Sequence, residues 1–351
     1  MRTTAKRKLR NLNSRASTVK KITAALILCG YAARAFASEP VIDMHVHATF
    51  TERKHSIPGC TGDQPVTYLP VDPASVTAEP QTESCPRPLL SETRRSQFEA
   101  DTIAALRRAG VRRAVLMGSP DILKRWESAA PGLFIPADVP KDLSDAEQQR
   151  FHSLLESGAI KVVAEAGLQY AGMRADDPLA EPIWSIAEQL DIPVGIHLGM
   201  GMSLTGEDVR TDPYRAALTS PFQLEEVLKK HPRLRIYVMH AASPLIDETI
   251  AMLFTYPSLY VDVSANDWNM PRAQFYSELK RLTDAGFSKR IMFGSDQTIW
   301  PQAIPLAIDT IKQAPFLTAK QKRDILYNNA ARFLRLTTKQ IAADHAATKA
   351  K

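Results

Sequence analysis

Six side chains of the types that bind metal ions each lie at the end of a short apolar run. The runs are rich in Val and Ile, and a loop-like stretch follows each of them. The six residues are His45, His47, Glu165, His197, His240 and Asp296. Imidazole and carboxylate groups form the ligand sets of zinc and similar divalent ions. We therefore expect these residues to converge on one metal site.

The first two histidines are two residues apart in the run Val41–His47. In a strand this spacing directs both side chains to the same face, so His45 and His47 can hold one ion together. A lone histidine at a strand end is more often a hydrogen-bonded core residue, but four of the eight histidines share this placement. Asp43 lies on the same face, where it either orients a ligand or satisfies buried backbone groups.

Asp296 ends the segment Phe293–Asp296, which reads Phe-Gly-Ser-Asp. A bound metal lowers the pKa of its water to about 7 and so provides hydroxide at neutral pH. A carboxylate beside it can accept the proton of the water and return it to the leaving group. We expect Asp296 and His240 to be catalytic, with Asp296 as the proton shuttle. The alternative for Asp296 is a structural cap of the next helix.

The role of Glu165 decides whether the expected site holds one metal ion or two. Its place in the fourth strand-like run would let its carboxylate bridge two ions. Lys161 is four residues earlier, roughly 13 Å along a strand, so a modified lysine is a poorer bridge. The alternative is that Glu165 only hydrogen-bonds a ligand histidine. We expect one or two divalent ions, zinc first and manganese as the alternative.

Eight strand-like runs alternate with helical patterns, and Pro193 and Pro232 end two of the helices. The expected strands are Val41–His47, Val111–Met117, Leu133–Val139, Ile160–Leu168, Pro193–His197, Leu234–His240, Leu259–Val263 and Ile291–Asp296. The expected helices are Gln97–Ala109, Asp145–Ser157, Leu179–Leu190, Leu224–Lys230, Leu245–Thr255, Phe275–Asp284 and a last one, Thr318–Leu334, with Thr318 as N-cap. This order predicts an α/β fold, a distorted (β/α)8 TIM barrel, which carries its chemistry at the C-terminal ends of its strands.

We expect the barrel to span residues 38–337, with a frayed polar tail at 338–351. A long insertion, residues 48–92, follows the first strand and contains seven prolines and no periodicity. Loops of this length in a compact domain are usually functional or disordered. We interpret it as a lid or pocket wall over the metal site, held by a disulfide between Cys60 and Cys85. Two unpaired thiols are the alternative.

The N-terminal segment, residues 1–37, has nine basic residues, no acidic ones, and an apolar stretch from Ile22 to Phe36. This pattern is typical of a secretory signal peptide, with cleavage expected after Ala37 and a periplasmic or secreted product. A disordered basic arm and a retained anchor are the alternatives. Removing nine of 44 basic residues leaves 35 against 38 acidic ones, a net charge near −3. That charge argues against a nucleic-acid partner, and we expect no stable membrane insertion after cleavage.

The motifs D-x-H-x-H, E, H, H and G-S-D, with the closing segment Tyr327–Leu334, resemble the amidohydrolase superfamily. They are most similar to its amidohydrolase-related branch, which also holds the aminocarboxymuconate-semialdehyde decarboxylase-like enzymes. The resemblance implies a distorted barrel with one or two divalent ions. It also implies metal-ligand roles for the six residues at their matching strands. Ala164–Leu168 resembles the Glu-containing strand of the metal-dependent DNase branch, which favours hydrolysis.

The function expected from these observations is an exported, metal-dependent hydrolase of an amide, lactone or other ester, acting through metal-bound hydroxide. The alternatives are a metal-dependent non-oxidative decarboxylase of a small carboxylic acid and a non-catalytic metal-containing barrel that binds a ligand. We expect a small-molecule substrate as the partner. The sequence does not decide whether the protein forms a homo-oligomer. Loop residues that can contact the substrate, or that merely pack, are Tyr170, Arg174, Arg210, Trp268 and Trp300.

Overall fold

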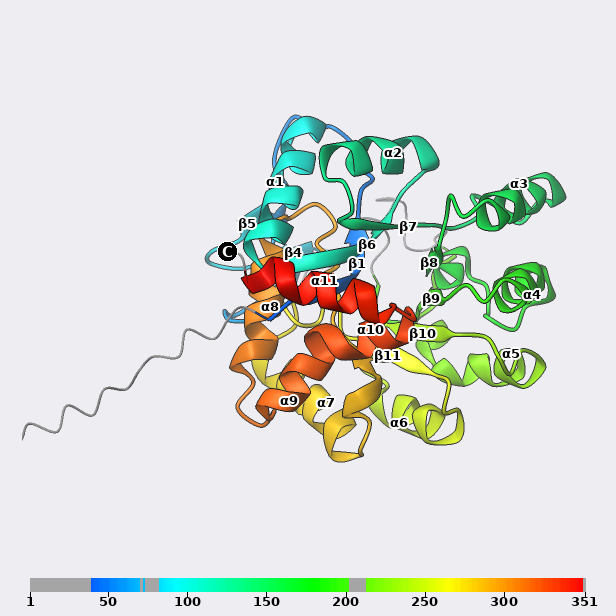
Figure 1. The fold of residues 1–351 in the computed structure, drawn as a ribbon. Coiled ribbons are helices and arrows are strands. Elements are labelled where there is room, and N and C mark those ends of the chain that lie inside the picture. Colours follow the sequence, from blue (N-terminus) through cyan, green and yellow to red (C-terminus); the bar gives the residue numbers. More distant parts are fainter. Residues whose placement is uncertain (1–38, 70–71, 73–81, 202–212, 350–351) are drawn as a thin grey trace, which may run out of the picture. The chain divides into compact units, whose positions relative to one another are not determined.

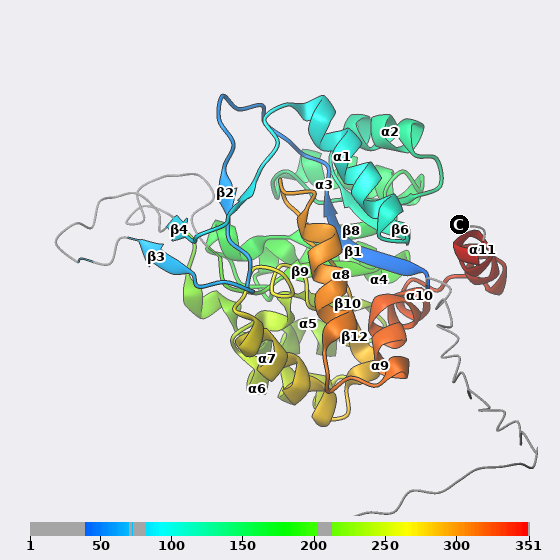
Figure 2. The ribbon, with the colours of Figure 1, turned by 90° about the vertical axis from the view of Figure 1, so that its left-hand side faces the viewer.

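Eight parallel strands follow one another around a nearly closed barrel in the computed structural model, which describes residues 39–69, 72, 82–201 and 213–349 (Figures 1 and 2). The strands, in their order around the sheet, are β1 (Val41–His47), β6 (Val111–Met117), β7 (Phe134–Asp138), β8 (Val162–Ala166), β9 (Val194–His197), β10 (Ile236–Met239), β11 (Tyr260–Asp262) and β12 (Ile291–Met292). The expected (β/α)8 barrel is confirmed.

Main-chain hydrogen bonds between the first and last strands close the ring. The amide of Met44 donates to the carbonyl of Phe293 at 3.0 Å, and the amide of Asp296 donates to the carbonyl of His45 at 2.8 Å. β12 is shorter than the expected strand Ile291–Asp296. Its chain turns away at Asp296, whose φ of 43° is incompatible with a strand.

Within the described residues, eight α-helices occupy the connections after the strands, and the expected ones are present within a few residues of their ends. Their bounds are α1 (Arg95–Arg108), α2 (Pro120–Ala129), α3 (Asp145–Glu156), α4 (Glu181–Gln189), α5 (Glu225–Lys230), α6 (Ile246–Thr255), α7 (Arg272–Asp284) and α8 (Ala303–Gln313). The helices predicted from the sequence did not include α2 and α8. α2 begins with a proline at its first position, where the missing N–H costs nothing.

The last helical segment runs through α9 (Ala319–Arg323), the π-helical turn η8 (Asp324–Asn328) and α10 (Asn329–Phe333). Thr318 caps it as expected: its side chain accepts from the amide of Gln321, whose own side chain accepts from the amide of Thr318. Tyr327 and Phe333 from this segment pack against strand residues such as Tyr237. The segment therefore belongs to the barrel core.

The C-terminal tail is helical, so the expectation of a frayed tail at 338–351 is wrong for its described part. Helix α11 (Thr338–Lys349) is anchored by Asp344, which accepts two hydrogen bonds from the Arg113 guanidinium at 2.8 and 3.0 Å. The Tyr327 hydroxyl also donates to Asp344 at 2.8 Å. Composition concealed this helix because mainly polar contacts, such as those of Asp344 and Thr348, fix it to the barrel in place of an apolar stripe.

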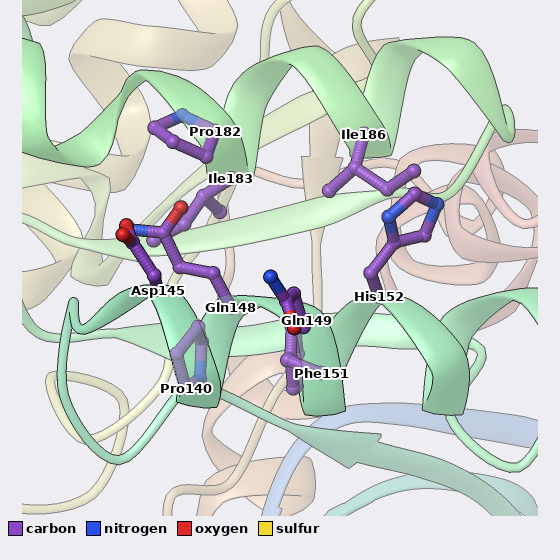
Figure 3. A pocket seen from close by; sticks show the side chains of 9 residues that line it. All are labelled: Pro140, Asp145, Gln148, Gln149, Phe151, His152, Pro182, Ile183 and Ile186. Carbon is purple, nitrogen blue, oxygen red and sulfur yellow. The ribbon is translucent and has the colours of Figure 1, made fainter.

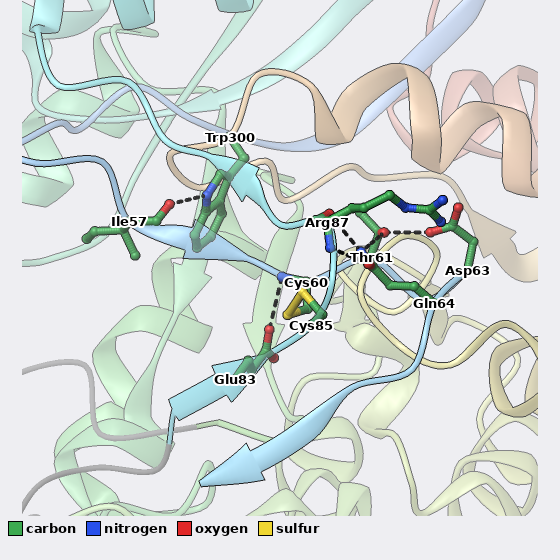
Figure 4. The surroundings of a disulfide bond; sticks show 9 residues. All are labelled: Ile57, Cys60, Thr61, Asp63, Gln64, Glu83, Cys85, Arg87 and Trp300. Carbon is green, nitrogen blue, oxygen red and sulfur yellow. Dashed lines mark hydrogen bonds between the residues drawn. A yellow bond between two sulfur atoms is a disulfide. The ribbon is translucent and has the colours of Figure 1, made fainter.

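The insertion contains more structure than its sequence predicted. Two short antiparallel pairs form within it: β2 (Pro58–Gly59) with β5 (Leu89–Leu90), and β3 (Thr67–Leu69) with β4 (Thr82–Ser84). A disulfide joins Cys60 to Cys85 beside them (Figure 4). The prolines and the disulfide obscured these pairs, because short strands stabilised by a cross-link need no hydrophobic periodicity.

Residues of the barrel hold the insertion in place. The indole N–H of Trp300 donates to the carbonyl of Ile57 at 3.0 Å (Figure 4). A Cβ at Gly59 would lie 2.7 Å from the Trp300 ring, so only glycine fits against it. The amide of Gly62 donates to the carbonyl of Trp268 at 2.7 Å. The insertion is thus fastened to the loops that follow β11 and β12.

The expected signal peptide, residues 1–37, lies outside the described residues. Among the residues that are described, none of the helices combines the length and apolar character needed to cross a membrane.

Candidate metal centre

The barrel brings the six expected ligand residues together at one end. His45 and His47 come from β1, Glu165 from β8 and His197 from the end of β9, while His240 and Asp296 directly follow β10 and β12. Their side chains form three overlapping groups, within each of which the ligand atoms lie no more than 4.8 Å apart. The groups are His45, His240 and Asp296; His45, His47 and Glu165; and Glu165, His197 and His240.

The spacing of the donor atoms fits a divalent ion. His45 Nε2 lies 3.2 Å from His47 Nε2, and Asp296 Oδ1 lies 2.9 Å from His47 Nε2 and 3.6 Å from His45 Nε2. Two tetrahedral ligands that are each about 2.0–2.2 Å from zinc lie roughly 3.3–3.6 Å from each other. The donors therefore lie close to the separations that an ion imposes.

Glu165 lies between two pairs of histidines and offers one carboxylate oxygen to each pair. Its Oε2 lies 3.6 Å from His45 Nε2 and 3.9 Å from His47 Nε2. Its Oε1 forms a short hydrogen bond with His197 Nδ1 and lies 3.5 Å from His240 Nε2. With this placement, Glu165 would be able to offer one oxygen to an ion on each side. The arrangement also contains the hydrogen bond to a ligand histidine that the alternative role of Glu165 required.

The charges of the centre favour a bound cation. Burial works against the charged form of His45, but the carboxylates of Asp296 and Glu165 outweigh it and raise the pKa of His45 to about 10. Burial also opposes ionisation of Glu165, yet the surrounding histidines hold its pKa well below the ordinary value. The two partly buried carboxylates, Glu165 and Asp296, thus create a negative potential that protons on the histidines, or a divalent ion, can balance.

Asp43 serves the backbone at the base of the site. Its Oδ1 accepts from the amides of His45 at 3.1 Å and Ser295 at 2.8 Å, and it contacts no ligand ring. Burial raises the pKa of Asp43 to about 6. Of the two roles considered for this residue, the structure supports the one in which it satisfies buried backbone groups.

Two of the candidate ligands have strained main chains. His240 and Asp296 have φ angles of 59° and 43°, in the left-handed region that non-glycine residues rarely adopt. Such strain costs on the order of 1–3 kcal/mol per residue and concentrates at functional sites. The strain places both side chains where the strand has ended and the loop turns across the barrel mouth.

Of the candidate substrate contacts, Tyr170 lies beside the centre. It belongs to the turn η2 (Leu168–Ala171) after β8, and its ring centre is 4.6 Å from that of His197. A Cβ on Gly201 would lie 3.1 Å from the Tyr170 hydroxyl oxygen, so this glycine leaves room for the ring. Among the described residues, no hydrogen bond of the Tyr170 hydroxyl is found.

Three of the other substrate candidates form contacts within the protein, and the fourth lies outside the described residues. Trp268 is buried and its indole N–H donates to the carbonyl of Ser295 at 2.9 Å, while Trp300 holds the insertion. Both indole N–H groups thus already have a main-chain acceptor, and the assignment of the two rings to the substrate stays a prediction. Arg174 forms an ion pair with Asp176 at 2.7 Å on the surface. Arg210 lies outside the described residues.

A separate cavity of about 240 Å³ lies between α3 and α4 (Figure 3). Polar side chains of α3, such as Gln149 and His152, face Ile183 and Ile186 of α4 across it. None of the six candidate ligands lines this cavity, so it is distinct from the metal centre.

Comparison with known proteins identifies the family to which the chain belongs. The family model described as amidohydrolase matches residues 42–336. The chain belongs to the amidohydrolase family. It is therefore an enzyme of the amidohydrolase superfamily, whose members bind divalent metal ions, and its cluster of histidines and carboxylates is able to hold one. A search of curated proteins found no match.

Several solved structures share the barrel of this amidohydrolase at low sequence identity. An uncharacterised TIM-barrel protein from Bordetella bronchiseptica is 19% identical, with 68% of this chain and 82% of that chain covered and a TM-score of 0.54. A probable 2-pyrone-4,6-dicarboxylic acid hydrolase from Acinetobacter baumannii is 14% identical, with 84% and 99% covered and a TM-score of 0.53. A dihydroxybenzoic acid decarboxylase from Polaromonas, with bound manganese, is 14% identical, with 68% and 86% covered and a TM-score of 0.50. At these identities the likeness establishes the fold.

Proposed function

We propose that this amidohydrolase hydrolyses an amide, a lactone or another ester of a small molecule, with two divalent ions in its centre. The observation that carries the proposal is the Glu165 carboxylate, which offers one oxygen to the His45–His47 pair and the other to the His197–His240 pair. Paired metal sites suit hydrolysis because together they clamp the attacking and leaving oxygens.

The residues of the chain divide the work around the ions. When bound, the ions supply Lewis acidity, which polarises a carbonyl and lowers the pKa of a coordinated water. Asp296 accepts the proton of the attacking water and transfers it to the leaving group. Asp296 is ionised and can therefore accept a proton: burial opposes ionisation, but the charge on His45 and the hydrogen bond from His47 keep the pKa of Asp296 below the ordinary value. His240, whose Nε2 lies 3.5 Å from Glu165 Oε1, completes the proposed ligand set.

Decarboxylation of a small carboxylic acid is the second candidate. The short hydrogen bond between Glu165 Oε1 and His197 Nδ1 favours it, because a glutamate engaged with a ligand ring need not bind metal. The centre would then hold one ion. The decarboxylase from Polaromonas with bound manganese has the same barrel and shows that the fold accommodates this chemistry.

We also propose that the protein is exported, with residues 1–37 as its signal peptide. The Cys60–Cys85 disulfide supports this, since structural disulfides persist mainly in oxidising compartments. Fusing residues 1–37 to a reporter that is active only after export tests the proposal. A reporter that remains in the cytoplasm contradicts it.

The deciding experiment is metal stoichiometry by inductively coupled plasma mass spectrometry, on gently purified protein that lacks residues 1–37. Two ions per chain, followed by turnover in a screen of lactones, esters and amides, support the proposal. One ion with release of carbon dioxide from aromatic carboxylic acids supports the second candidate. No ion after reconstitution with zinc or manganese contradicts both and leaves a ligand-binding barrel.

A further inference from the structure

Ser264, two residues after the end of β11, contacts two histidines of the metal centre at once. The residue is fully buried. Its hydroxyl oxygen lies 2.9 Å from His45 Nδ1 and 3.2 Å from His240 Nδ1. Its main-chain carbonyl oxygen lies 3.0 Å from His240 Nδ1. One serine thus meets the ring nitrogens of His45 and His240 that face away from the other candidate ligands.

The direction of these hydrogen bonds follows from Asp262. Its Oδ1 accepts from the amides of His240 at 2.9 Å and Ser264 at 3.1 Å, so this oxygen is an acceptor. The Ser264 hydroxyl lies 2.7 Å from the same oxygen and therefore donates its hydrogen to it. The hydroxyl oxygen has lone pairs left, and His45 Nδ1 must supply the hydrogen for the remaining contact.

The hydrogen on His240 is fixed independently. A carbonyl oxygen can only accept, so the contact between His240 Nδ1 and the Ser264 carbonyl requires a hydrogen on Nδ1. Both histidines consequently keep Nε2 for the centre. In a metal-binding histidine, the partner of one ring nitrogen decides which nitrogen is left for the metal.

Gly294 makes the contact possible. A Cβ on this residue would lie 2.9 Å from the Cβ of His45 and 3.0 Å from the Cβ of Ser264. The missing side chain allows the ends of β1 and β11 to approach across β12. This gives a physical reason for glycine in the Phe-Gly-Ser-Asp segment.

His197, unlike His45 and His240, makes no hydrogen bond with Ser264. It directs Nδ1 toward Glu165, while its buried Nε2 has no hydrogen-bond partner among the described residues. The centre therefore combines histidines that offer different nitrogens, and only His45 and His240 are oriented by Ser264.

We propose that Ser264 is a positioning residue of the metal centre, whose hydroxyl and carbonyl hold His45 and His240 with hydrogen on Nδ1 and Nε2 directed at the metal. The inference rests on the proposed metal centre but not on which reaction it performs. Asp262 orients the Ser264 hydroxyl through the hydrogen bond that it accepts.

The test compares Ser264→Ala with the wild type in zinc-loaded protein labelled with ¹⁵N-histidine. The substitution removes the hydroxyl and keeps the carbonyl. The Nδ1–H signal of His45 is expected to lose its protection from solvent exchange, whereas that of His240 stays. Zinc affinity, measured by competition with a chelator, is expected to fall about 10- to 100-fold, as for other partners of ligand histidines.

Ser295→Ala is the matched control. Ser295 is equally buried, but its hydroxyl donates to the carbonyl of His45 at 3.3 Å and touches no ligand ring. This variant should keep both Nδ1–H signals and wild-type zinc affinity. Ser264→Cys, which keeps a weak acceptor, should fall between wild type and Ser264→Ala, and it replaces Ser264→Ala if that variant does not fold.

The outcomes separate the two proposals. Unchanged zinc affinity in Ser264→Ala, or an equal loss in Ser295→Ala, overturns the role of Ser264 while the metal centre stands. Loss of both Nδ1–H signals in Ser264→Ala also overturns it, since the carbonyl alone should hold His240. A wild type that binds no zinc contradicts the metal centre itself.

Discussion

At the scale of single residues, Asp296 is the side chain whose proposed role is easiest to isolate. Asp296→Asn keeps an oxygen that can bind metal but removes the base. We expect metal content near wild type and a loss of about 10²- to 10⁴-fold in kcat, the usual contribution of a positioned acid or base. Steady-state kinetics with parallel metal analysis measure both. Full activity in this variant would remove Asp296 from the mechanism.

Tyr170 lends itself to a test of substrate contact. Tyr170→Phe keeps the ring that packs on His197 and removes the hydroxyl, which has no hydrogen-bond partner among the described residues. If the hydroxyl donates to the substrate carbonyl, kcat/KM should fall about 10²- to 10³-fold, as when one oxyanion donor is lost. Thermal stability should change little, because the hydroxyl has no hydrogen bond to the described residues that the substitution would break. Wild-type kcat/KM would show that the ring only packs.

Residue type and position in the sequence identified some residues of the site and missed others. The six candidate ligands were recognisable because histidines and carboxylates are uncommon at the ends of buried strands. Ser264 was not, since serine is common and its partner His45 is 219 positions away in the chain. The sequence places Trp268 and Trp300 in loops but does not show that the indole N–H of each already has a main-chain acceptor.

At the scale of elements, the insertion depends on its disulfide. Cys60 and Cys85 close a stretch of 25 residues. A cross-link over such a loop contributes about 3 kcal/mol. In a Cys60→Ser/Cys85→Ser double variant we expect faster local opening, with amide hydrogen exchange in the segments around β2 and β5 accelerated about 100-fold.

The barrel strand β6 serves as the internal reference for that experiment. Its exchange should not change, because the part of the insertion around the disulfide is fastened to loops after β11 and β12, and only Ala48, at the start of the insertion, bonds to β6. Equal acceleration in β6 would mean that the disulfide stabilises the whole domain. Unchanged exchange in the insertion would mean that the contacts of Trp300 and Gly62 suffice without the disulfide.

Strands and helices were predictable to different degrees. β1 and β6 were placed to the residue because buried parallel strands read as continuous apolar runs. The strand β12 was predicted to be longer than it is, because the sequence does not show the left-handed conformation of Asp296. α11 was missed because its attachment through Asp344 and Arg113 links residues 231 positions apart, which no local pattern reveals.

At the scale of the whole molecule, the metal centre joins strands from around the barrel. The six candidate ligands come from β1, β8, β9, β10 and β12 or the residues that follow them, so bound ions would cross-link both sides of the closure between β12 and β1. An ion that binds only the folded state stabilises it by about 4 kcal/mol at a free concentration 1,000 times its Kd.

Removing the metal should therefore destabilise the entire barrel. We expect a chelator to lower the Tm of the protein lacking residues 1–37 by on the order of 10 °C, and added zinc or manganese to restore it. His47→Asn, which lacks one ligand, should show a much smaller shift. His152→Asn is the matched control, because His152 pairs with Glu156 on α3 and not with the centre, so its shift should equal that of the wild type. If wild type and His47→Asn respond alike, the ion binds elsewhere, and the strands of this barrel are held together by packing and main-chain hydrogen bonds alone.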